Sequence, residues 1–388
     1  MEKPKIFKDE TKLFPEYIPK KTPHREMEVN KLKSLFDVVL QNPAEASQQV
    51  FILGPVGSGK TLVSKKFLQY IDEQYQTNAI RIKTYYTNCR VNKVFSSILN
   101  NILATIGHSF PNRGFSVDEI VQYFLSVSLE ENVHIISVFD EFDALVAHEG
   151  VEPLYIITRI REMAKDRQIL SSIIISKTFS YLDKADRGIL SSIQKNIIKL
   201  EAYSETQLND ILFDRILMAF NEGTVGNETT ELIAKIASRY GDARYAIELL
   251  HLAGRIADFR GEDRVRPDHV REAKLQLPPQ IRKEEIGYLD DHEKILLLSL
   301  SKLLKENLGE RVTLKELQQE YNMSCEEYNK TPLKYTQLWI RIKDLVQRDL
   351  ISAEVSSRGH RGKTTFISLL NVPAEQIYNE TKERLKNG

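Results

Sequence analysis

The sequence predicts an α/β core built on a parallel five-stranded sheet, followed by a small helical domain and a C-terminal domain of three helices and a β-hairpin. Three observations predict this. Short β-branched runs alternate with amphipathic helical stretches up to residue 200, which is typical of a parallel sheet covered by helices on both faces. The strand signal disappears after Ser204. Two β-prone runs return only near the C-terminus, after further helical stretches.

The first strand of the core is expected over residues 49–53, where a short apolar run ends in a glycine-rich turn. Apolar residues at helical spacing follow at once, over 61–70. Further strands and amphipathic helices then alternate. The other expected strands are 79–84, 134–139, 172–175 and 196–200, and two of the expected helices are 117–129 and 154–164.

The helical domain is expected to begin at Ser204, because Gln207 follows at the spacing of a capping box. It ends near Pro278 and Pro279, and the charged stretch 282–285 after them indicates a linker. The predicted domains are residues 1–202, 203–280 and 286–388.

The third domain has the pattern of a winged helix. Helical stretches precede two β-prone runs, which enclose a segment rich in turn-forming residues. A generic α+β accessory domain shares this pattern and is the alternative. The expected helices are 291–305, 314–321 and 335–348, and the expected strands are 351–355 and 364–369.

Composition limits the class of protein. At 388 residues the chain can form two or three domains that each bury a core. Its 54 basic and 54 acidic residues cancel, so any nucleic-acid site must be a local patch. Cys89 and Cys325 fall in different predicted domains, which argues for a reducing compartment and against a disulfide framework or zinc site. No apolar run approaches the roughly 20 residues that span a bilayer, so a cytoplasmic protein without a membrane partner is expected.

A phosphate-binding loop lies between the first strand and the first helix. Residues 54–61, Gly-Pro-Val-Gly-Ser-Gly-Lys-Thr, match the pattern G-x-x-x-x-G-K-[ST] in full. In such a loop backbone N–H groups face the phosphates, Lys60 neutralises the β and γ oxygens, and the Thr61 hydroxyl ligates Mg²⁺. A chance glycine-rich turn is the alternative. The predicted contacts to ATP or ADP are Pro55, Val56, Gly57, Ser58, Gly59, Lys60, Thr61 and Leu62.

Two adjacent carboxylates follow the third predicted strand. Asp140 is expected to hold Mg²⁺ through water, and Glu141 to orient or polarise the water that attacks the γ-phosphate. An ordinary acidic strand end is the alternative. The phosphate-binding loop upstream favours the catalytic interpretation.

Two arginines are weaker candidates, because each is a single charged residue. Arg244 opens a helix in the segment 241–244, Gly-Asp-Ala-Arg, from which it could reach the γ-phosphate and report the nucleotide state. Arg187 lies in a turn-like segment after the fourth strand, where it could contact the nucleotide of a neighbouring subunit. For both residues a solvated surface arginine is the alternative.

A basic surface is predicted in the third domain. Its third helix is the predicted recognition helix, and the turn 358–363 forms a compact basic tip that can lie over a groove and pair with phosphates. An exposed loop kept soluble by its charges is the alternative. Trp339 is expected in the core of this domain rather than stacked on a base. The predicted DNA contacts here are Tyr335, Thr336, Gln337, Arg358, His360, Arg361 and Lys363.

These motifs, in this order and at this spacing, resemble the archaeal initiators of DNA replication. Those proteins are AAA+ ATPases related to the large subunit of the eukaryotic origin recognition complex and to its helicase-licensing partner. The likeness covers nearly the whole chain. It implies an AAA+ αβα core with five parallel strands, a helical lid domain and a C-terminal winged-helix domain. It also implies that Tyr17, Ile18, Pro19 and Arg25 lie near the adenine.

The resemblance implies a protein that binds double-stranded origin DNA and helps to recruit or load the replicative minichromosome maintenance helicase. ATP with Mg²⁺ is implied to act as a slowly hydrolysed switch, and other initiator paralogues on the nucleoid are implied partners. DNA is implied to contact the wing and also a helical insertion before the third strand. The insertion matches residues 111–116, with Arg113, Gly114, Phe115 and Ser116 as the expected contacts.

Two positions depart from the family pattern. Lys177 follows the fourth strand, where the family usually has an asparagine that senses the γ-phosphate. A lysine contacts phosphate as a point charge but cannot orient water as an amide does. The arginine that acts on a neighbouring subunit matches Arg187 or, one residue later, Gly188. Hydrolysis of ATP is therefore less well supported than binding of ATP. The alternative function is that of a remodelling ATPase or a transcription regulator that docks through its winged helix.

Overall fold

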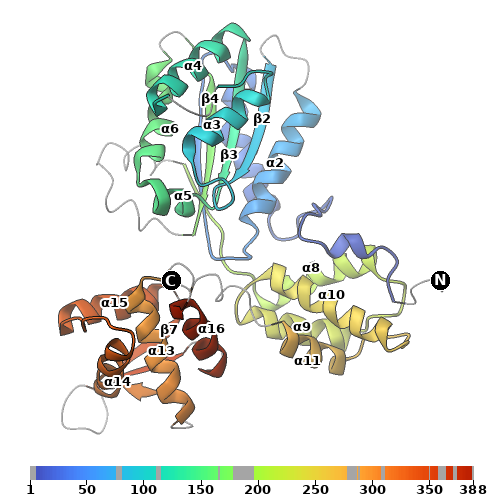
Figure 1. Ribbon diagram of the computed structural model, residues 1–388. Helices are drawn as coiled ribbons and strands as arrows, with labels where there is room; N and C mark the ends of the chain where they lie inside the picture. Colours follow the sequence, from blue (N-terminus) through green and yellow to red (C-terminus); the bar gives the residue numbers. More distant parts are fainter. Residues whose placement is uncertain are drawn as a thin grey trace. The chain divides into compact units, whose positions relative to one another are not determined.

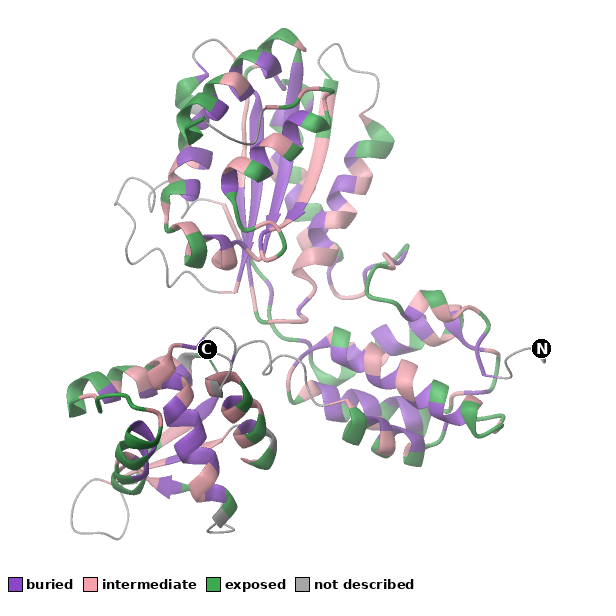
Figure 2. Cartoon of the chain, viewed as in Figure 1, coloured by how far each residue is buried: buried purple, intermediate pink, exposed green. Residues whose placement is uncertain are grey.

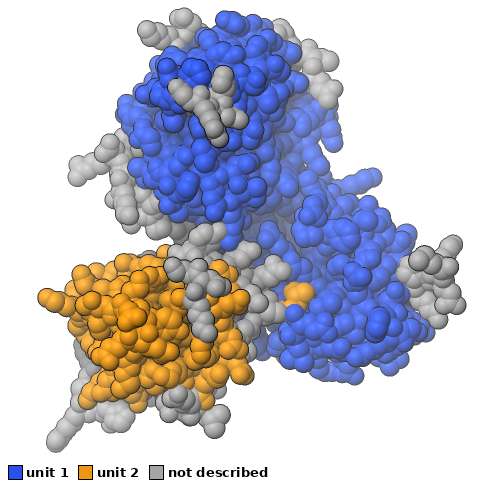
Figure 3. Space-filling model, in the orientation of Figure 1, with its two compact units in different colours: residues 1–276 blue, residues 277–388 orange. Residues whose placement is uncertain are grey.

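The computed structural model describes residues 6–75, 81–110, 115–164, 167–177, 196–277, 286, 289–306, 311–348, 350–356, 364–369 and 374–386. The chain divides into two compact units, residues 1–276 and 277–388 (Figure 3). The first unit contains the α/β core and the helical domain, and the second contains the C-terminal helices and hairpin (Figure 1). The finer division into three domains stays a prediction.

The core of the first unit is a five-stranded sheet in which every neighbouring pair of strands is parallel, as the sequence predicts. The strand order is β2-β3-β4-β1-β5, so β1 lies between β4 and β5. The second strand continues past its predicted end, because residues 85–88 extend its pairing with β3. The strands are β1 Gln49–Leu53, β2 Arg81–Asn88, β3 Val133–Asp140, β4 Leu170–Ser176 and β5 Ile197–Lys199.

Helices cover both faces of the sheet (Figure 1). Along β1, Val50 and Ile52 join the hydrophobic core beneath α1 and α2, while Phe51 joins the core on the other face, beneath α3, α4, α5 and α6. The central strands β3 and β4 are buried along their whole length (Figure 2), as expected for a parallel sheet covered twice. The helices are α1 Glu26–Gln41, α2 Lys60–Gln74, α3 Phe95–Ala104, α4 Val117–Glu130, α5 Phe142–Glu149 and α6 Glu152–Met163.

The helical domain begins with the predicted capping box, in which the Ser204 side chain accepts a hydrogen bond from Gln207 N and the Gln207 side chain accepts one from Ser204 N. The beginning of the chain packs on this domain, with the ring of Phe7 lying 4.9 Å from that of Phe220. Two stretches of chain, 14–25 and 200–204, therefore join the helical domain to the core. Its elements are α8 Glu205–Ala219, α9 Asn227–Ser238, α10 Ala243–Phe259 and α11 Pro267–Gln276, together with the 3-10 helix η1 Glu10–Leu13.

The second unit is a winged helix, as predicted. Its hairpin strands β7 and β8 pair antiparallel, and β8 also pairs with β6, which the sequence pattern did not indicate. The helix α16, also not predicted, contributes Ile377 to a buried core that includes Leu338, and Trp339 packs against this core as expected. None of the described helices has both the length and the apolar composition that crossing a bilayer requires. The elements are α13 Asp291–Glu306, β6 Val312–Thr313, α14 Leu314–Glu327, α15 Tyr335–Gln347, β7 Ile351–Ser356, β8 Thr364–Leu369 and α16 Ala374–Lys386.

His134, near the start of β3, is buried and joins three parts of the core. Its Nδ1 lies 2.7 Å from the Pro43 carbonyl oxygen, and its Nε2 lies 2.9 Å from Ser171 Oγ. Because a carbonyl oxygen only accepts hydrogen bonds, Nδ1 carries the proton and Nε2 accepts from the Ser171 hydroxyl. Burial lowers the pKa of the His134 imidazole from 6.5 to about 4, since the charged form would be desolvated.

This buried imidazole predicts a loss of stability at mildly acidic pH. The unfolded chain takes up a proton near pH 6.5, whereas the folded imidazole stays neutral until about pH 4. Above the unfolded pKa, His134 therefore makes its full contribution to the free energy of unfolding. As the pH falls to about 5, about 2 kcal/mol of this contribution is lost. Urea unfolding followed by circular dichroism at about pH 7.5 and about pH 5 measures the change.

His134→Gln is the matched comparison, because glutamine keeps a donor and an acceptor but does not titrate. The drop in unfolding free energy between the two pH values should be about 2 kcal/mol smaller in this variant than in the natural protein. The same drop in both proteins would contradict the assignment.

Candidate nucleotide-binding site

The phosphate-binding loop joins β1 to α2 in the predicted strand, loop and helix arrangement. Gly57 and Gly59 have φ angles of 71° and 94°, a left-handed conformation that glycine tolerates and other residues rarely adopt. Gly59 is the N-cap of α2, so the first N–H groups and the positive end of the helix dipole face the loop. Of the other predicted contacts, Pro55, Val56 and Ser58 lie in the loop, and Lys60, Thr61 and Leu62 lie in the first turn of α2.

Lys60 reaches back across the loop. Its Nζ donates hydrogen bonds to the carbonyl oxygens of Gly54 and Pro55, both at 2.7 Å. Burial lowers the pKa of Lys60 to about 8, and the charges of Asp140 and Asp143 oppose this shift. Phosphate oxygens would stabilise the ammonium form further. Lys60 is therefore placed to act as the cationic partner of a bound phosphate.

Asp140 ends β3 opposite the first turn of α2. Its Oδ2 accepts a hydrogen bond from Thr61 Oγ1 at 2.6 Å and another from the Tyr86 hydroxyl at 2.7 Å. The oxygens of Thr61 and Asp140 thus lie side by side, with Asp140 buried and Thr61 half-buried. Mg²⁺ is usually bound by one or two protein oxygens, with phosphate and water completing its shell. These two residues fit the Mg²⁺ site that the sequence predicts, and the contact of Tyr86 with Asp140 was not predicted.

Glu141 has a left-handed backbone conformation with a φ of 52°, which is uncommon for a non-glycine residue and is found at functional sites. Burial, followed by the charge of Asp140, raises the pKa of the Glu141 carboxyl. A raised pKa suits a general base. Arg90 Nη1 lies 3.7 Å from Glu141 Oε2, and Lys177, at the end of β4, interacts electrostatically with both Glu141 and Lys60. Sequence reasoning missed Arg90, which belongs to no recognised motif.

The helical domain contacts the loop through the start of α10. Asp242 caps this helix, and its Oδ1 accepts a hydrogen bond from Arg244 N at 2.8 Å. The next residue, Ala243, donates its N–H to the Gly57 carbonyl oxygen at 3.2 Å. The Asp242 carboxylate is buried directly beside Gly57. The start of α10 and the phosphate-binding loop are therefore in direct contact.

Arg244 follows this contact and is exposed. Burial raises the pKa of the Tyr86 hydroxyl, as does the charge of Asp140, and the positive charge of Arg244 opposes both effects. The charge of Arg244 therefore acts on the predicted Mg²⁺ site, where the Tyr86 hydroxyl donates to Asp140.

Three stretches of the chain match known protein families. Residues 45–179 match an AAA domain, residues 209–275 match the Cdc6 AAA+ ATPase-type lid domain, and residues 284–380 match the CDC6 C-terminal winged helix domain. The ORC1-type DNA replication protein 2 of Sulfurisphaera tokodaii is 33% identical over an alignment that covers 98% of this chain and 94% of that protein. The chain belongs to the archaeal ORC1-type DNA replication proteins.

Two solved structures of Aeropyrum pernix proteins match nearly the whole chain. The Aeropyrum pernix ORC1 protein in complex with DNA is 28% identical with a TM-score of 0.72, and the match covers 99% of this chain and 98% of that one. The Aeropyrum pernix ORC2 protein, solved with ADPNP and ADP, has a TM-score of 0.79 at 24% identity over 98% and 99% of the two chains, which shows the fold alone. The five-stranded core, lid and winged helix are thus the family's architecture.

In this ORC1-type chain the residues predicted near the adenine differ from one another in burial and in the residues they contact. The ring of Tyr17 packs on the lid, 5.0 Å from the guanidinium carbon of Arg215 on α8. Ile18 is half-buried, and Pro19 is buried. Arg25 is buried and donates a hydrogen bond to a carbonyl of the phosphate-binding loop. Contact of these residues with the adenine stays a prediction.

The predicted DNA contacts of this ORC1-type chain fall in three groups. Phe115 is exposed and its ring lies 4.5 Å from that of Phe110, while Ser116 forms the capping box of α4. Tyr335, Thr336 and Gln337 are exposed in the first turn of α15. Several predicted residues lie outside the described part of the chain, namely Arg113, Gly114, Arg358, His360, Arg361 and Lys363, together with the predicted trans-acting Arg187.

Gly57→Ala is expected to displace the lid from the phosphate-binding loop. A Cβ at this position would collide with the Asp242 carboxylate, and overpacking of this kind costs about 1–3 kcal/mol. We therefore expect the affinity for a fluorescent ADP analogue to fall by about tenfold or more, measured by titration.

Gly223→Ala is the matched control, because Gly223 also has a left-handed φ, of 76°, but no atom within 4 Å of an added Cβ. This variant should bind the analogue as the natural protein does. The double variant Gly57→Ala/Asp242→Gly removes the colliding carboxylate and should recover part of the lost affinity. Equal losses in Gly57→Ala and Gly223→Ala would contradict the prediction.

Proposed function

We propose that this protein binds double-stranded origin DNA in a way that depends on whether ATP or ADP occupies the phosphate-binding loop, and that it helps to recruit or load the minichromosome maintenance helicase. The observation that carries the proposal is the hydrogen bond from Ala243 N to the Gly57 carbonyl oxygen. The lid contacts the phosphate-binding loop directly. A nucleotide that changes the conformation of the loop therefore favours some orientations of the lid over others. A nucleotide switch requires this property.

We propose further that hydrolysis is slow. Lys177 stands where an amide would orient water, and an ammonium group cannot do so in the same way. Thr61 and Asp140 would hold Mg²⁺, which would supply positive charge to offset that of the phosphates. A nucleotide that is held for a long time suits a switch better than a motor.

The DNA-binding part of the proposal rests on the winged helix. The helix α15 buries Leu338 and Ile342 and exposes Gln337 and Lys343 on its other side, and Tyr335 is exposed in its first turn. A helix with one face packed and one face free is the arrangement that enters a major groove. The similar Aeropyrum pernix ORC1 protein was solved in complex with DNA, which supports the same role here. The protein would act on the nucleoid beside other initiator paralogues.

Arg361→Ala tests the DNA-binding proposal. The wing tip is expected to pair its cations with phosphates, so loss of one arginine should reduce the affinity for an origin repeat by roughly 1–3 kcal/mol and lower the salt slope by about one. Fluorescence anisotropy with a labelled origin duplex and a scrambled duplex, at several salt concentrations, measures both quantities.

Lys235→Ala is the control for this test, because it removes the same charge from an exposed position on α9 of the lid. It should leave both the affinity and the salt slope unchanged. Equal binding of the origin and scrambled duplexes by the natural protein would refute specific origin recognition.

A further inference from the structure

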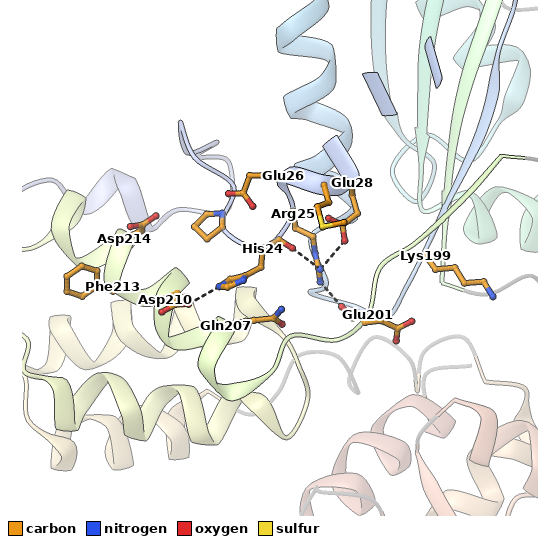
Figure 4. A pocket seen from close by; sticks show the side chains of 12 residues that line it. His24, Arg25, Glu26, Glu28, Lys199, Glu201, Gln207, Asp210, Phe213 and Asp214 are labelled. Carbon is orange, nitrogen blue, oxygen red and sulfur yellow. Dashed lines mark hydrogen bonds and ion pairs between the residues drawn. The ribbon is translucent and has the colours of Figure 1, made fainter. Parts of the chain in front are cut away.

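Arg25 directly precedes α1 and is almost completely buried, with 4% of its surface exposed. Arginine is rarely buried unless its donors are paired. Here Nε donates to the carbonyl oxygen of Ser58 at 2.8 Å, and Nη2 donates to that of Glu201 at 2.6 Å. The remaining terminal nitrogen, Nη1, lies 3.3 Å from Glu28 Oε1 (Figure 4). One guanidinium therefore joins the phosphate-binding loop to the chain that leads from β5 to the lid.

The same guanidinium also contacts the first residues of the helical domain. Its central carbon lies 4.0 Å from the centre of the Tyr203 ring. Tyr203 N donates to the Gly241 carbonyl oxygen at 3.1 Å, and Gly241 immediately precedes the Asp242 cap of α10. A Cβ at Gly59 would lie 2.7 Å from the Tyr203 hydroxyl. Tyr203 is therefore packed between Arg25, the loop and the start of the lid helix that touches the loop.

The neighbouring residue, His24, reaches the lid from the same point in the chain. Its φ of 63° is left-handed, and its Nε2 lies 2.9 Å from Asp210 Oδ2 on α8 (Figure 4). His24 and Arg25 thus contact the loop, the connecting chain and the lid helix α8, and Tyr203 links Arg25 to the residue that precedes α10. Both residues line the same pocket. We call this dipeptide the His24–Arg25 elbow.

We propose that Arg25 is a positioning residue, which couples the conformation of the phosphate-binding loop to the orientation of the lid, and that His24 supports it. When the loop N–H groups turn toward phosphates, the Ser58 carbonyl moves with its peptide planes. A guanidinium is planar and its donors point in fixed directions. When the Ser58 carbonyl moves, the guanidinium therefore moves with it and displaces Glu201 and Tyr203. This inference rests on the proposed nucleotide switch but not on DNA binding.

Arg25→Lys separates this role from simple charge or packing. Lysine keeps the positive charge and much of the stem, but a single ammonium cannot hold two carbonyls in the fixed geometry of a guanidinium. His24→Asn is the second variant, because asparagine tolerates a left-handed φ but is too short to keep the contact with Asp210. Lys31→Ala is the control, since Lys31 lies on α1 and contacts the carbonyl oxygen of Ile197 in β5 rather than the loop.

The experiment measures the distance between the core and the lid in the full chain. Spin labels are placed on Glu73→Cys in α2 and Glu231→Cys in α9, which are exposed, whereas the natural cysteines are buried. Distances are recorded without nucleotide, with ADP and with a non-hydrolysable ATP analogue, each at saturation. Titration with a fluorescent ADP analogue gives the affinity of every variant.

The natural protein and Lys31→Ala should show a distance change on nucleotide binding. At nucleotide concentrations that saturate each variant, Arg25→Lys should lose at least half of the distance change, whatever its affinity for the ADP analogue. His24→Asn should lose a smaller part. A full distance change in saturated Arg25→Lys would overturn the inference and leave the switch intact. An Arg25→Lys protein that no nucleotide concentration saturates would also overturn the inference, because Arg25 would then be needed for binding itself. No distance change in the natural protein would overturn both.

Discussion

Replacing Glu141 by glutamine is expected to reduce steady-state ATP hydrolysis by about 100-fold or more, because a general base contributes on the order of 10²–10⁴ to a rate. Glutamine matches glutamate in size but cannot accept the proton of the attacking water. Nucleotide binding should stay close to that of the natural protein, since Glu141 approaches the site from the end of β3 and is not part of the loop that holds the phosphates. Phosphate release at saturating ATP measures the turnover.

The control for this prediction is Glu130→Gln, the same change at an exposed position at the end of α4. It should hydrolyse ATP at the natural rate. Turnover by Glu141→Gln equal to that of the natural protein would show that the base lies elsewhere. Tighter retention of ATP by Glu141→Gln, measured by filter binding, would be a second sign that binding and hydrolysis have been separated.

Lys60→Ala is expected to weaken nucleotide binding by on the order of 100-fold, because a charge-assisted contact to phosphate is worth about 1.5–3 kcal/mol. The pKa of Lys60 is about 8 before nucleotide binds. As pH rises above that value the free protein loses the ammonium proton, whereas the phosphate complex retains it. Binding should therefore become about tenfold weaker between about pH 7 and about pH 9.

Titrations with a fluorescent ADP analogue across this pH range test both parts of the prediction. Lys60→Ala should bind weakly at every pH and show no such slope. Lys66→Ala, on the same helix but outside the loop, where Lys66 donates to Gln69, is the control and should keep the natural affinity and the natural slope. If the natural protein bound equally well at both ends of the range, the protonation of Lys60 would not limit binding.

The elements that sequence reasoning placed well are those with a strong local signal. The apolar run of β1, the glycines of the loop and the helical spacing after Lys60 are consecutive, so their pattern alone specifies strand, loop and helix. The second strand, β2, extends beyond its predicted end for a physical reason. β2 is an edge strand whose residues are mostly exposed or half-buried, so its second half lacks the apolar signal of a buried strand.

The contacts that sequence reasoning missed are formed between distant parts of the chain. Arg25 binds carbonyl oxygens of residues that lie 33 and 176 positions away in the sequence. A local sequence pattern cannot predict such distant partners. Arg90 and Tyr86 reach the site only because β2 lies beside β3. The strand β6 has two residues and exists through its pairing with β8, which is again a property of the folded domain. Sequence reasoning therefore predicted candidate residues of the site, and the structure added further residues that contact them.

The central claim is that nucleotide state controls specific binding to origin DNA. Footprinting of chromosomal origin DNA with ATP, with ADP and without nucleotide tests it most directly. The natural protein should protect discrete repeats, and the extent of protection should differ between ATP and ADP. Lys60→Ala should give one footprint under all three conditions. Uniform, salt-sensitive protection that ignores both sequence and nucleotide would contradict the account.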